Sequence, residues 1–316
     1  MSINPLGDRL RLLRSLVGRT PLRCFRLGWA ELCVKIEYGN PTGSHKDRIA
    51  VNMLSALIRS EGVRKGGCVA EISSGNTAAA VAWAARLLGL KPVLFVEKTA
   101  SEVKKLIIRS MGGEIVEIGD ELLTRDEAVE EAERRGCILL DQMSNEYNHL
   151  AHYEGTGVEI LEQTHWDLDA FVMGVGTGGT VTGVGRRLKE ELGSTLVAAV
   201  TPAGSPLDTS SNGQERDSIE GLASHSVPPL FERHRSVVDR VVAVRSREAL
   251  AGIVELLRET GIAAGPSTGA AFVAARRLVE EGVLDRGSRI VILAADSLTR
   301  YPEVMRSLAE GGSSFS

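Results

Sequence analysis

Segments typical of β-strands alternate with segments typical of α-helices from residue 32 to near the end of the chain. This alternation is typical of units in which each helix returns the chain so that the next strand runs parallel to the last. We therefore predict an α/β fold with parallel sheets that are covered by helices. The predicted strands are residues 32–38, 68–72, 92–96, 114–118, 138–140, 170–175, 196–200, 241–244 and 289–294. The predicted helices include residues 45–59, 101–111, 125–135, 247–260 and 267–281.

Two sheet units fit this pattern, and 316 residues suffice for two domains. We predict an N-terminal domain over residues 1–145, whose sheet comes mainly from residues 40–145. The C-terminal domain is predicted over residues 146–316. We expect residues 310–316 to form a frayed tail, and no regulatory domain to follow the last strand.

Composition argues against several functional classes. The net charge of −4 gives no basic footprint for nucleic acid. No apolar run approaches the roughly 20 residues needed to cross a bilayer, and the first residues are no secretory signal. The cysteines lack metal-ligand spacing, so we predict no metal site. Cys24, Cys33, Cys68 and Cys137 are scattered along the chain, and the last three look like small core residues. A reducing cytoplasm is the simplest location.

A turn-forming stretch, residues 40–48, joins the first predicted strand to the first predicted helix. Pro41 and Gly43 mark a sharp turn, so Lys46 falls at the start of the helix. The positive end of the helix dipole favours the neutral amine of a lysine there, which can act as a nucleophile or as a proton-transfer base. A solvated lysine in a first helical turn is the simpler interpretation of this stretch alone.

A glycine-rich loop follows the strand at 170–175 and precedes another helical segment. Its N–H groups and hydroxyls lie at a helix N-terminus, a setting that binds phosphate without lysine or arginine. A tight strand-to-helix turn fits the same residues equally well. The loop residues are Gly176, Thr177, Gly178, Gly179 and Thr180.

The same stretch also satisfies G-x-G-x-x-G, the dinucleotide fingerprint, with Gly174, Gly176 and Gly179. That fingerprint expects an acidic residue about 20 positions further on, at the end of the next strand, to bind the ribose. Residues 198–202, where that strand ends, include no carboxylate. We therefore rank an enzyme that binds a nicotinamide cofactor here well below one in which this loop binds another phosphate.

A second loop of this kind lies between the strand at 68–72 and an alanine-rich helix. Its hydroxyls, amide and backbone N–H groups suit a carboxylate, and they also suit capping of the helix. The loop residues are Ser73, Ser74, Gly75, Asn76 and Thr77.

With these three stretches together, the sequence resembles the cysteine synthase family. These are pyridoxal-phosphate enzymes of fold type II, and they include the catalytic domains of cystathionine β-synthases. The resemblance covers nearly the whole chain, from Gly18 to Ser297. It implies pyridoxal 5′-phosphate as cofactor, a homodimer, and a crossover of part of residues 13–34 onto the C-terminal domain. The family more often has Thr and Gly where Ser73 and Ala78 stand here.

The resemblance also implies roles for individual residues. Lys46 would hold the cofactor as a Schiff base and then take the substrate's α-proton. Asn76 would contact the oxygen of the cofactor ring. Residues 73–77, together with Gln142, would bind the substrate carboxylate, and the loop at 176–180 would hold the cofactor phosphate.

Four further residues carry expectations or open alternatives. By resemblance, Ser267 would meet the ring nitrogen with a neutral hydroxyl, which favours expelling a β leaving group; it could instead be only an N-cap. The stretch 221–226 departs most from the family, and its His225 would border the entrance of the second substrate or be an ordinary solvated loop histidine. We interpret His149 and His152 as surface-loop histidines.

These features predict an enzyme with small amino-acid substrates. A serine activated at oxygen, O-acetylserine or O-phosphoserine, would lose its leaving group to give an aminoacrylate. Sulfide or another small nucleophile would then add, giving cysteine or a β-substituted alanine. Cystathionine β-synthase-like or diaminopropionate-forming chemistry remains open, as does a serine or threonine dehydratase. A binding module that keeps only the fold is the non-enzymatic alternative.

Overall fold

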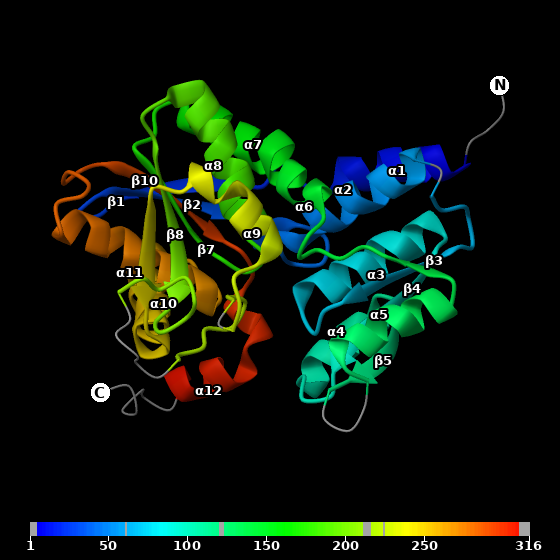
Figure 1. Cartoon of the computed structure of the whole chain (residues 1–316). Coiled ribbons are helices and arrows are strands. Elements are labelled where there is room, and N and C mark those ends of the chain that lie inside the picture. Colours follow the sequence, from blue (N-terminus) through cyan, green and yellow to red (C-terminus); the bar gives the residue numbers. More distant parts are fainter. Residues whose placement is uncertain (1–4, 61, 120–122, 211–215, 224, 310–316) are drawn as a thin grey trace. The chain divides into compact units, whose positions relative to one another are not determined.

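The computed structural model describes residues 5–60, 62–119, 123–210, 216–223 and 225–309. The chain divides into two compact units. Unit 1 comprises Met1–Gly18 and Asn40–Asn148, and unit 2 comprises Arg19–Gly39 and His149–Ser316. Each unit has its own sheet and its own helices (Figure 1). The chain therefore enters unit 2 early, leaves it to form most of unit 1, and then returns.

The sheet of unit 1 has the strand order β5-β4-β3-β6, and all neighbouring strands in it are parallel. Helix α3 is formed by an alanine-rich run and is buried along most of its length. Helix α5 starts with a capping box between Thr124 and Glu127 and packs Ala128 and Ala132 against the sheet. The elements are α1 (Pro5–Leu16), α2 (Lys46–Arg59), β3 (Cys68–Ile72), α3 (Asn76–Leu88), β4 (Lys91–Glu97), α4 (Glu102–Ser110), β5 (Glu114–Ile118), α5 (Arg125–Arg134) and β6 (Cys137–Leu139).

The sheet of unit 2 has the order β1-β2-β10-β7-β8-β9, with β1 antiparallel to β2 and the other pairs parallel. Helices α10 and α11 cover one face, and α7 and α8 cover the other (Figure 1). Their buried apolar side chains belong to the two core clusters on these faces. The elements are β1 (Leu22–Arg26), β2 (Glu31–Ile36), α7 (Gly157–Thr164), β7 (Ala170–Gly174), α8 (Gly179–Leu192), β8 (Leu196–Pro202), α9 (Pro229–His234), β9 (Arg240–Val244), α10 (Ser246–Thr260), α11 (Pro266–Glu280), β10 (Arg289–Ala294) and α12 (Pro302–Ala309). Helix α6 (Glu146–Ala151) leads from unit 1 into unit 2.

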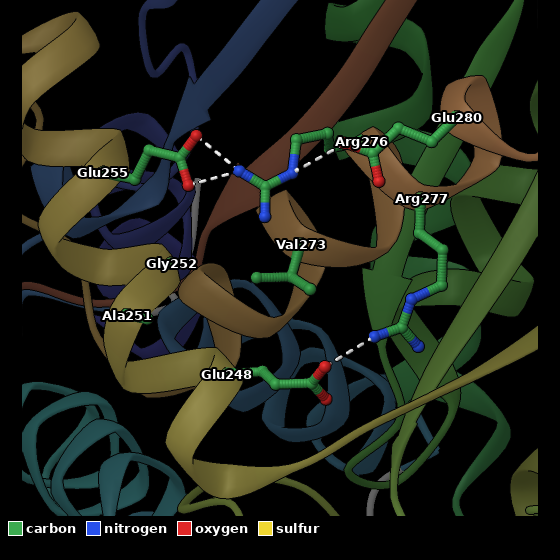
Figure 2. Close-up of a pocket in the computed structure, with 8 residues that line it drawn as sticks. All are labelled: Glu248, Ala251, Gly252, Glu255, Val273, Arg276, Arg277 and Glu280. Carbon is green, nitrogen blue, oxygen red and sulfur yellow. Dashed lines mark hydrogen bonds and ion pairs between the residues drawn. The ribbon is translucent and has the colours of Figure 1, made fainter. Parts of the chain in front are cut away.

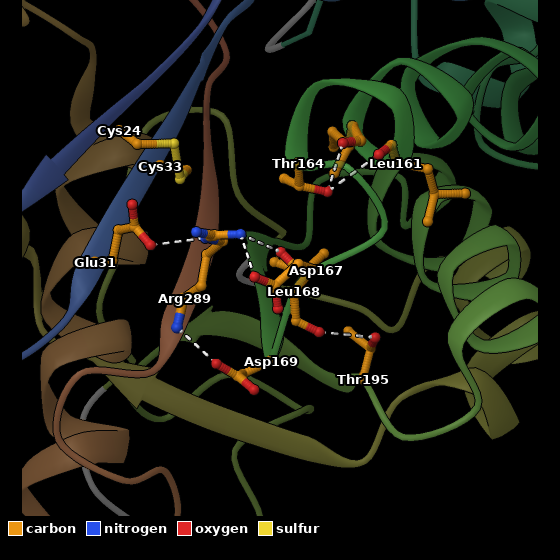
Figure 3. Close-up of polar contacts among 11 residues, drawn as sticks. Cys24, Glu31, Cys33, Leu161, Thr164, Asp167, Leu168, Asp169, Thr195 and Arg289 are labelled. Atoms are coloured by element: carbon orange, nitrogen blue, oxygen red, sulfur yellow. Dashed lines mark hydrogen bonds and ion pairs between the residues drawn. A yellow bond between two sulfur atoms is a disulfide. The ribbon is translucent and has the colours of Figure 1, made fainter.

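Polar contacts attach the early segment 19–39 to the rest of unit 2. The fully buried Lys35 donates from Nζ to the carbonyl of Thr20 at 2.6 Å and to Glu159 of α7 at 2.7 Å. On β10, Arg289 donates to Glu31 at 2.7 Å and to Asp167 at 2.6 Å (Figure 3). A buried lysine is tolerable only when its charge is paired and its protons are bonded, and this pairing fixes β2 in the sheet.

The predicted α/β fold with parallel sheets is confirmed, with one exception in unit 2. Strand β1 is antiparallel to β2, and the sequence analysis assigned no strand there. Its burial alternates weakly, and three of its five residues are exposed or basic, which hides it from a hydrophobic pattern. In the part of the chain that the structure describes, no helix combines the length and apolarity needed to cross a bilayer.

Cys33 and Cys137 are buried and Cys68 packs against the core of its unit, as expected for small core residues, but all three are paired in disulfides. Cys24 is bonded to Cys33, and Cys68 to Cys137. Each pair occupies directly opposed positions on neighbouring strands, β1 with β2 (Figure 3) and β3 with β6. Strand register brings these cysteines together, and their spacing in the sequence does not reveal it.

Candidate active site

Lys46 is the first residue of α2 and directly follows a tight turn. In that turn Gly43 has φ +82°, a backbone conformation that other residues rarely adopt, and its N–H donates to Asn40 O at 2.8 Å. The buried carboxylate of Asp47 accepts from the N–H of Thr42 at 2.6 Å and also from its hydroxyl. Asp47 thereby fixes where α2 begins, and with it the backbone of Lys46.

The loop at 73–77 leads from β3 to α3. Ser73 accepts from the N–H of Gly75 at 3.3 Å, and Ser74 accepts from the N–H of Glu97 at 2.8 Å. Asn76 is the first helical residue, and the N-cap is Gly75, which makes no side-chain capping bond. Helix capping therefore does not account for the polar side chains of this loop.

Thr77 and Gln142, two of the predicted carboxylate ligands, are bonded to each other within unit 1. The buried hydroxyl of Thr77 donates to Gln142 Oε1 at 2.6 Å. The backbone of Gln142 is also fixed, since its N–H donates to Glu71 at 3.2 Å and its carbonyl accepts from Asn148 at 2.8 Å. Because Oε1 takes the proton of Thr77, the amide group of Gln142 that can serve a carboxylate is its NH2 donor.

Glu71 is a functional candidate that the sequence analysis missed. Its side chain is fully buried on β3, and burial, helped by the negative charge of Asp141, raises its pKa to about 8. Backbone N–H groups of Gln142 and Ile72 lower the pKa and oppose that rise. At neutral pH the protonated form is therefore favoured, and Glu71 adds little negative charge behind a loop suited to anions. The available signal was a lone carboxyl group in an apolar strand.

In unit 2, the loop at 176–180 presents bare backbone at the start of α8. Gly178 is the N-cap with φ +89°, and a β-carbon there would lie 2.4 Å from Phe231 Cβ. A β-carbon at Gly176 would lie 2.8 Å from the carbonyl oxygen of Gly221. Both positions therefore require glycine. The resulting donor set, backbone N–H groups and two threonine hydroxyls at a helix N-terminus, fits a phosphate group.

Ser267 lies in the first turn of α11, 8% exposed. The alternative that it is only an N-cap is wrong, because the N-cap of this helix is Gly265. A β-carbon at Gly221 would lie 3.8 Å from Ser267 Cβ, and Gly221 also touches Gly176. The structure thus brings Gly176, Gly221 and Ser267 together within unit 2.

The histidines differ from their sequence interpretations. His149 and His152 are not surface residues, since both are fully buried against α8. They lie in α6 and in the π-helical turn His152–Thr156 that follows it, and a glycine of α8, Gly183, lets that turn approach closely. His225 is exposed in a bend after Gly221, as either of its predicted interpretations allows.

A groove of about 230 Å³ lies between α10 and α11 (Figure 2). Its arginines are held by glutamates: Arg276 by Glu255, and Arg277 by Glu248 at 2.9 Å. Beneath it the helices touch at Gly252, where a β-carbon would lie 2.5 Å from Gly269 O. None of the predicted site residues lines this groove, so it is no part of the candidate site.

Residues 13–296 match the family described as "Pyridoxal-phosphate dependent enzyme". The chain belongs to this family. Its cofactor is pyridoxal phosphate, and its fold is fold type II, both as predicted. The donor set of the loop at 176–180 in unit 2 suits the phosphate group of this cofactor.

Named relatives cover most of the chain. It is 33% identical over 316 residues to a cystathionine beta-synthase of Apis mellifera, covering 93% of this chain and 62% of that protein. It is 33% identical over 291 residues to cysteine synthase A of Salmonella typhi, covering 88% of this chain and 89% of that protein. The chain thus spans less than two thirds of the length of the cystathionine beta-synthase it matches.

Solved structures agree. O-ureido-L-serine synthase superimposes with a TM-score of 0.86 at 30% identity, covering 96% of this chain and 97% of that one. A hydrogen sulfide-producing enzyme of Fusobacterium nucleatum gives a TM-score of 0.85 at 31% identity, covering 92% of this chain and 97% of that one.

Proposed function

We propose that this protein catalyses a β-replacement on an O-activated serine, giving cysteine or another β-substituted alanine. The observation that carries the proposal is the hydrogen bond from Thr77 to Gln142. It orients an amide N–H2 donor in the same unit as the loop at 73–77, as recognition of an amino-acid carboxylate requires. The likeness to cysteine synthase A over 89% of that protein supports the same activity.

In unit 1, Lys46 would carry the cofactor and, once released by the substrate amine, would take the proton from the substrate's α-carbon. Its place at the positive end of α2 favours the neutral amine that this step needs. Ser73, Ser74, Gly75, Asn76 and Thr77 would hold the substrate carboxylate, and Asn76 would also contact the cofactor. A carboxylate held in this way keeps the α-proton within reach of one base.

In unit 2, residues 176–180 would hold the cofactor phosphate, and Ser267 would face the ring nitrogen. Bound pyridoxal phosphate supplies the electron sink that makes loss of the α-proton and of the β substituent possible. A neutral hydroxyl at Ser267 leaves that sink weaker than a carboxylate partner would. Rapid expulsion of the leaving group is then favoured over a persistent carbanion, which suits β-replacement.

The nucleophile is a separate question, because proteins of this fold are named for different products, O-ureido-L-serine and hydrogen sulfide. We propose that the exposed His225 borders the entrance of the second substrate, where it can bond to a nucleophile larger than sulfide. Gly221, four residues earlier, lies against Ser267, which supports this placement.

The test incubates the holoenzyme with O-acetylserine, O-phosphoserine or serine. Each donor is tried alone and with one added nucleophile: sulfide, a small thiol or a small amine. We expect a β-substituted alanine that requires both a donor and a nucleophile, and no turnover by Lys46→Ala. Keto acid formed at full rate without a nucleophile would instead identify a dehydratase. Cofactor binding with neither product would indicate a binding module.

We further propose, from the family resemblance, a homodimer in the cytoplasm. The disulfides bear on the location, because disulfides are rare in a reducing cytosol. Light scattering gives the assembly, and alkylation of thiols in freshly lysed cells shows whether these cysteines are paired in the cell. Fully paired cysteines before any air oxidation would contradict the cytoplasmic location.

A further inference from the structure

His152 links the π-helical turn to the phosphate loop of unit 2. Its ring is fully buried, with Nδ1 2.9 Å from Thr156 Oγ1 and Nε2 3.2 Å from Thr180 Oγ1. Thr180 belongs to the loop at 176–180, and Thr156 closes the same π-helical turn that His152 opens. A π-helical turn is uncommon and often marks a functional position, so this link deserves a functional explanation.

The direction of these hydrogen bonds decides what Thr180 can do. A hydroxyl has one proton, and a neutral imidazole has one N–H and one acceptor nitrogen. If Thr180 donated its proton to His152, its hydroxyl could offer a phosphate dianion only oxygen lone pairs, which repel it. If His152 donates from Nε2, the proton of Thr180 is available for the phosphate.

The neighbouring histidine provides an internal contrast. The hydroxyl of Thr182 donates to the carbonyl of Gly178 at 2.9 Å, so it accepts from His149 Nδ1, which lies 2.9 Å away. His149 therefore carries a proton on Nδ1. The hydroxyl proton of Thr182 is therefore used on the carbonyl of Gly178, whereas that of Thr180 is not used in this way.

We infer that His152 is a positioning residue that directs the hydroxyl of Thr180 toward the cofactor phosphate. Thr156 donates to Nδ1 of His152, His152 donates from Nε2 to Thr180, and Thr180 donates to the phosphate. Burial of the ring against α8 keeps water from competing for these bonds. The inference rests on the proposed phosphate site.

The first experiment measures the tautomers in the unmodified protein by 15N NMR, with pyridoxal phosphate bound. We expect the proton of neutral His152 on Nε2 and that of His149 on Nδ1. A proton on Nδ1 of neutral His152 would overturn the inference, and this reading does not depend on any variant folding.

The second experiment measures the affinity of the apoprotein for pyridoxal phosphate and for pyridoxal, which lacks the phosphate. His152→Leu should weaken pyridoxal phosphate about 10-fold and leave pyridoxal unchanged, as expected from a weakened hydrogen bond to a charged group. His152→Gln, which keeps an N–H donor, should recover most of the loss. Thr164→Val, a matched change at a buried threonine in α7 that bonds to Ile160 O, should change neither affinity.

A double-mutant cycle completes the test. In a Thr180→Val background, His152→Leu should cost nothing further, because the hydroxyl that it directs is gone. An equal loss in both backgrounds, or an equal loss for pyridoxal, would show that His152 acts on the fold alone and would overturn the inference. If the unmodified protein bound pyridoxal phosphate no better than pyridoxal, the proposed phosphate site itself would fail.

Discussion

The loop at 73–77 in unit 1 and the loop at 176–180 in unit 2 share one local plan and differ in chemistry. Each follows the carboxyl end of a parallel strand and opens a helix, so each has the positive end of a helix dipole. The first carries hydroxyls and an amide, and its Thr77 bonds to Gln142, whose N–H donates to the buried Glu71. The second is mostly glycine and rests on the buried His152. The shared plan suits an anion, and we propose that the side chains decide which one each loop binds.

The difference follows from the anions themselves. A carboxylate is planar with two oxygens, and a few side-chain donors at defined angles suffice to hold it. A phosphate group presents three terminal oxygens, and backbone N–H groups can converge on it only where no β-carbon intervenes. The absence of space for a β-carbon at Gly176 and Gly178 thus supports the proposal that the loop at 176–180 holds the cofactor phosphate.

The largest effect is expected from Gly178→Ala, paired with Gly193→Ala at the other end of α8. Both residues have positive φ, but a β-carbon would clash with Phe231 at Gly178 and meet nothing within 4 Å at Gly193. Gly193→Ala should cost about 1–2 kcal/mol of unfolding free energy for its backbone alone. Gly178→Ala should cost about 1–3 kcal/mol more from overpacking and abolish cofactor retention.

Urea unfolding and cofactor absorbance after gel filtration check this pair. Equal losses of stability in the two variants would mean that Phe231 moves aside without cost. Normal cofactor retention by Gly178→Ala would place the phosphate elsewhere.

The second prediction concerns the loop at 73–77, the proposed site of the substrate carboxylate. Thr77→Val should release the amide of Gln142 and lower kcat/KM for the serine donor about 10-fold to 100-fold, the range for a lost hydrogen bond to a charged group. Cofactor affinity should stay within about 2-fold. Thr195→Val, a buried threonine of unit 2 that bonds to Leu168 O, is the control. A parallel fall in cofactor affinity would contradict the proposal that Thr77 acts on the substrate and not on the cofactor.

The third prediction uses the pKa of Glu71. Its folded-state pKa of about 8 lies above the ordinary value of 4.5, so between these values the folded protein holds a proton that the unfolded chain has lost. This group therefore lowers stability as pH rises from about 4.5 to about 8, by up to about 1.4 kcal/mol per pH unit, and has no further effect above. Glu71→Gln should remove that slope.

Urea midpoints of both proteins at pH 5, 6, 7 and 8 give the comparison, with Glu117→Gln as a control at a partly exposed carboxylate of the same sheet. If the unmodified protein and Glu71→Gln lost stability in parallel, Glu71 would be ionised throughout. Gln142, the partner of Thr77, would then donate its N–H to a buried negative charge.

The smallest effect is expected at His225, which belongs to neither loop. Because the side chain is exposed, water competes for its hydrogen bonds, so His225→Phe should slow addition of the preferred nucleophile by only about 10-fold. Loss of the donor's leaving group should keep its rate. Stopped-flow measurement of the two half-reactions separates them, and unchanged rates in both would make His225 an ordinary solvated residue.

Local sequence signals predicted where helices, strands and loops lie better than they predicted which side chains are buried or in contact. The strand-loop-helix order around Gly178 and the helix start at Lys46 follow from glycine, proline and hydrophobic pattern within a few residues. Burial of His152 could not be predicted in this way, because it depends on packing against α8. The bond between Thr77 and Gln142 and the pairing of Cys68 with Cys137 likewise depend on contacts between segments that are far apart in the sequence.

The place of β2 in the sheet has a consequence for biogenesis. Glu31 pairs with Arg289, 258 residues later, so one side of β2 has no partner while most of the chain is being made. At about 5–20 residues per second, ribosomal synthesis leaves that edge open for roughly 10 to 50 s. An open apolar strand edge attracts other chains, so we expect the nascent protein to pass through an aggregation-prone stage before β10 emerges. Slower translation near the end of the message, or a chaperone that shields residues 31–36 until β10 emerges, would then govern the yield of folded protein more than its final stability does.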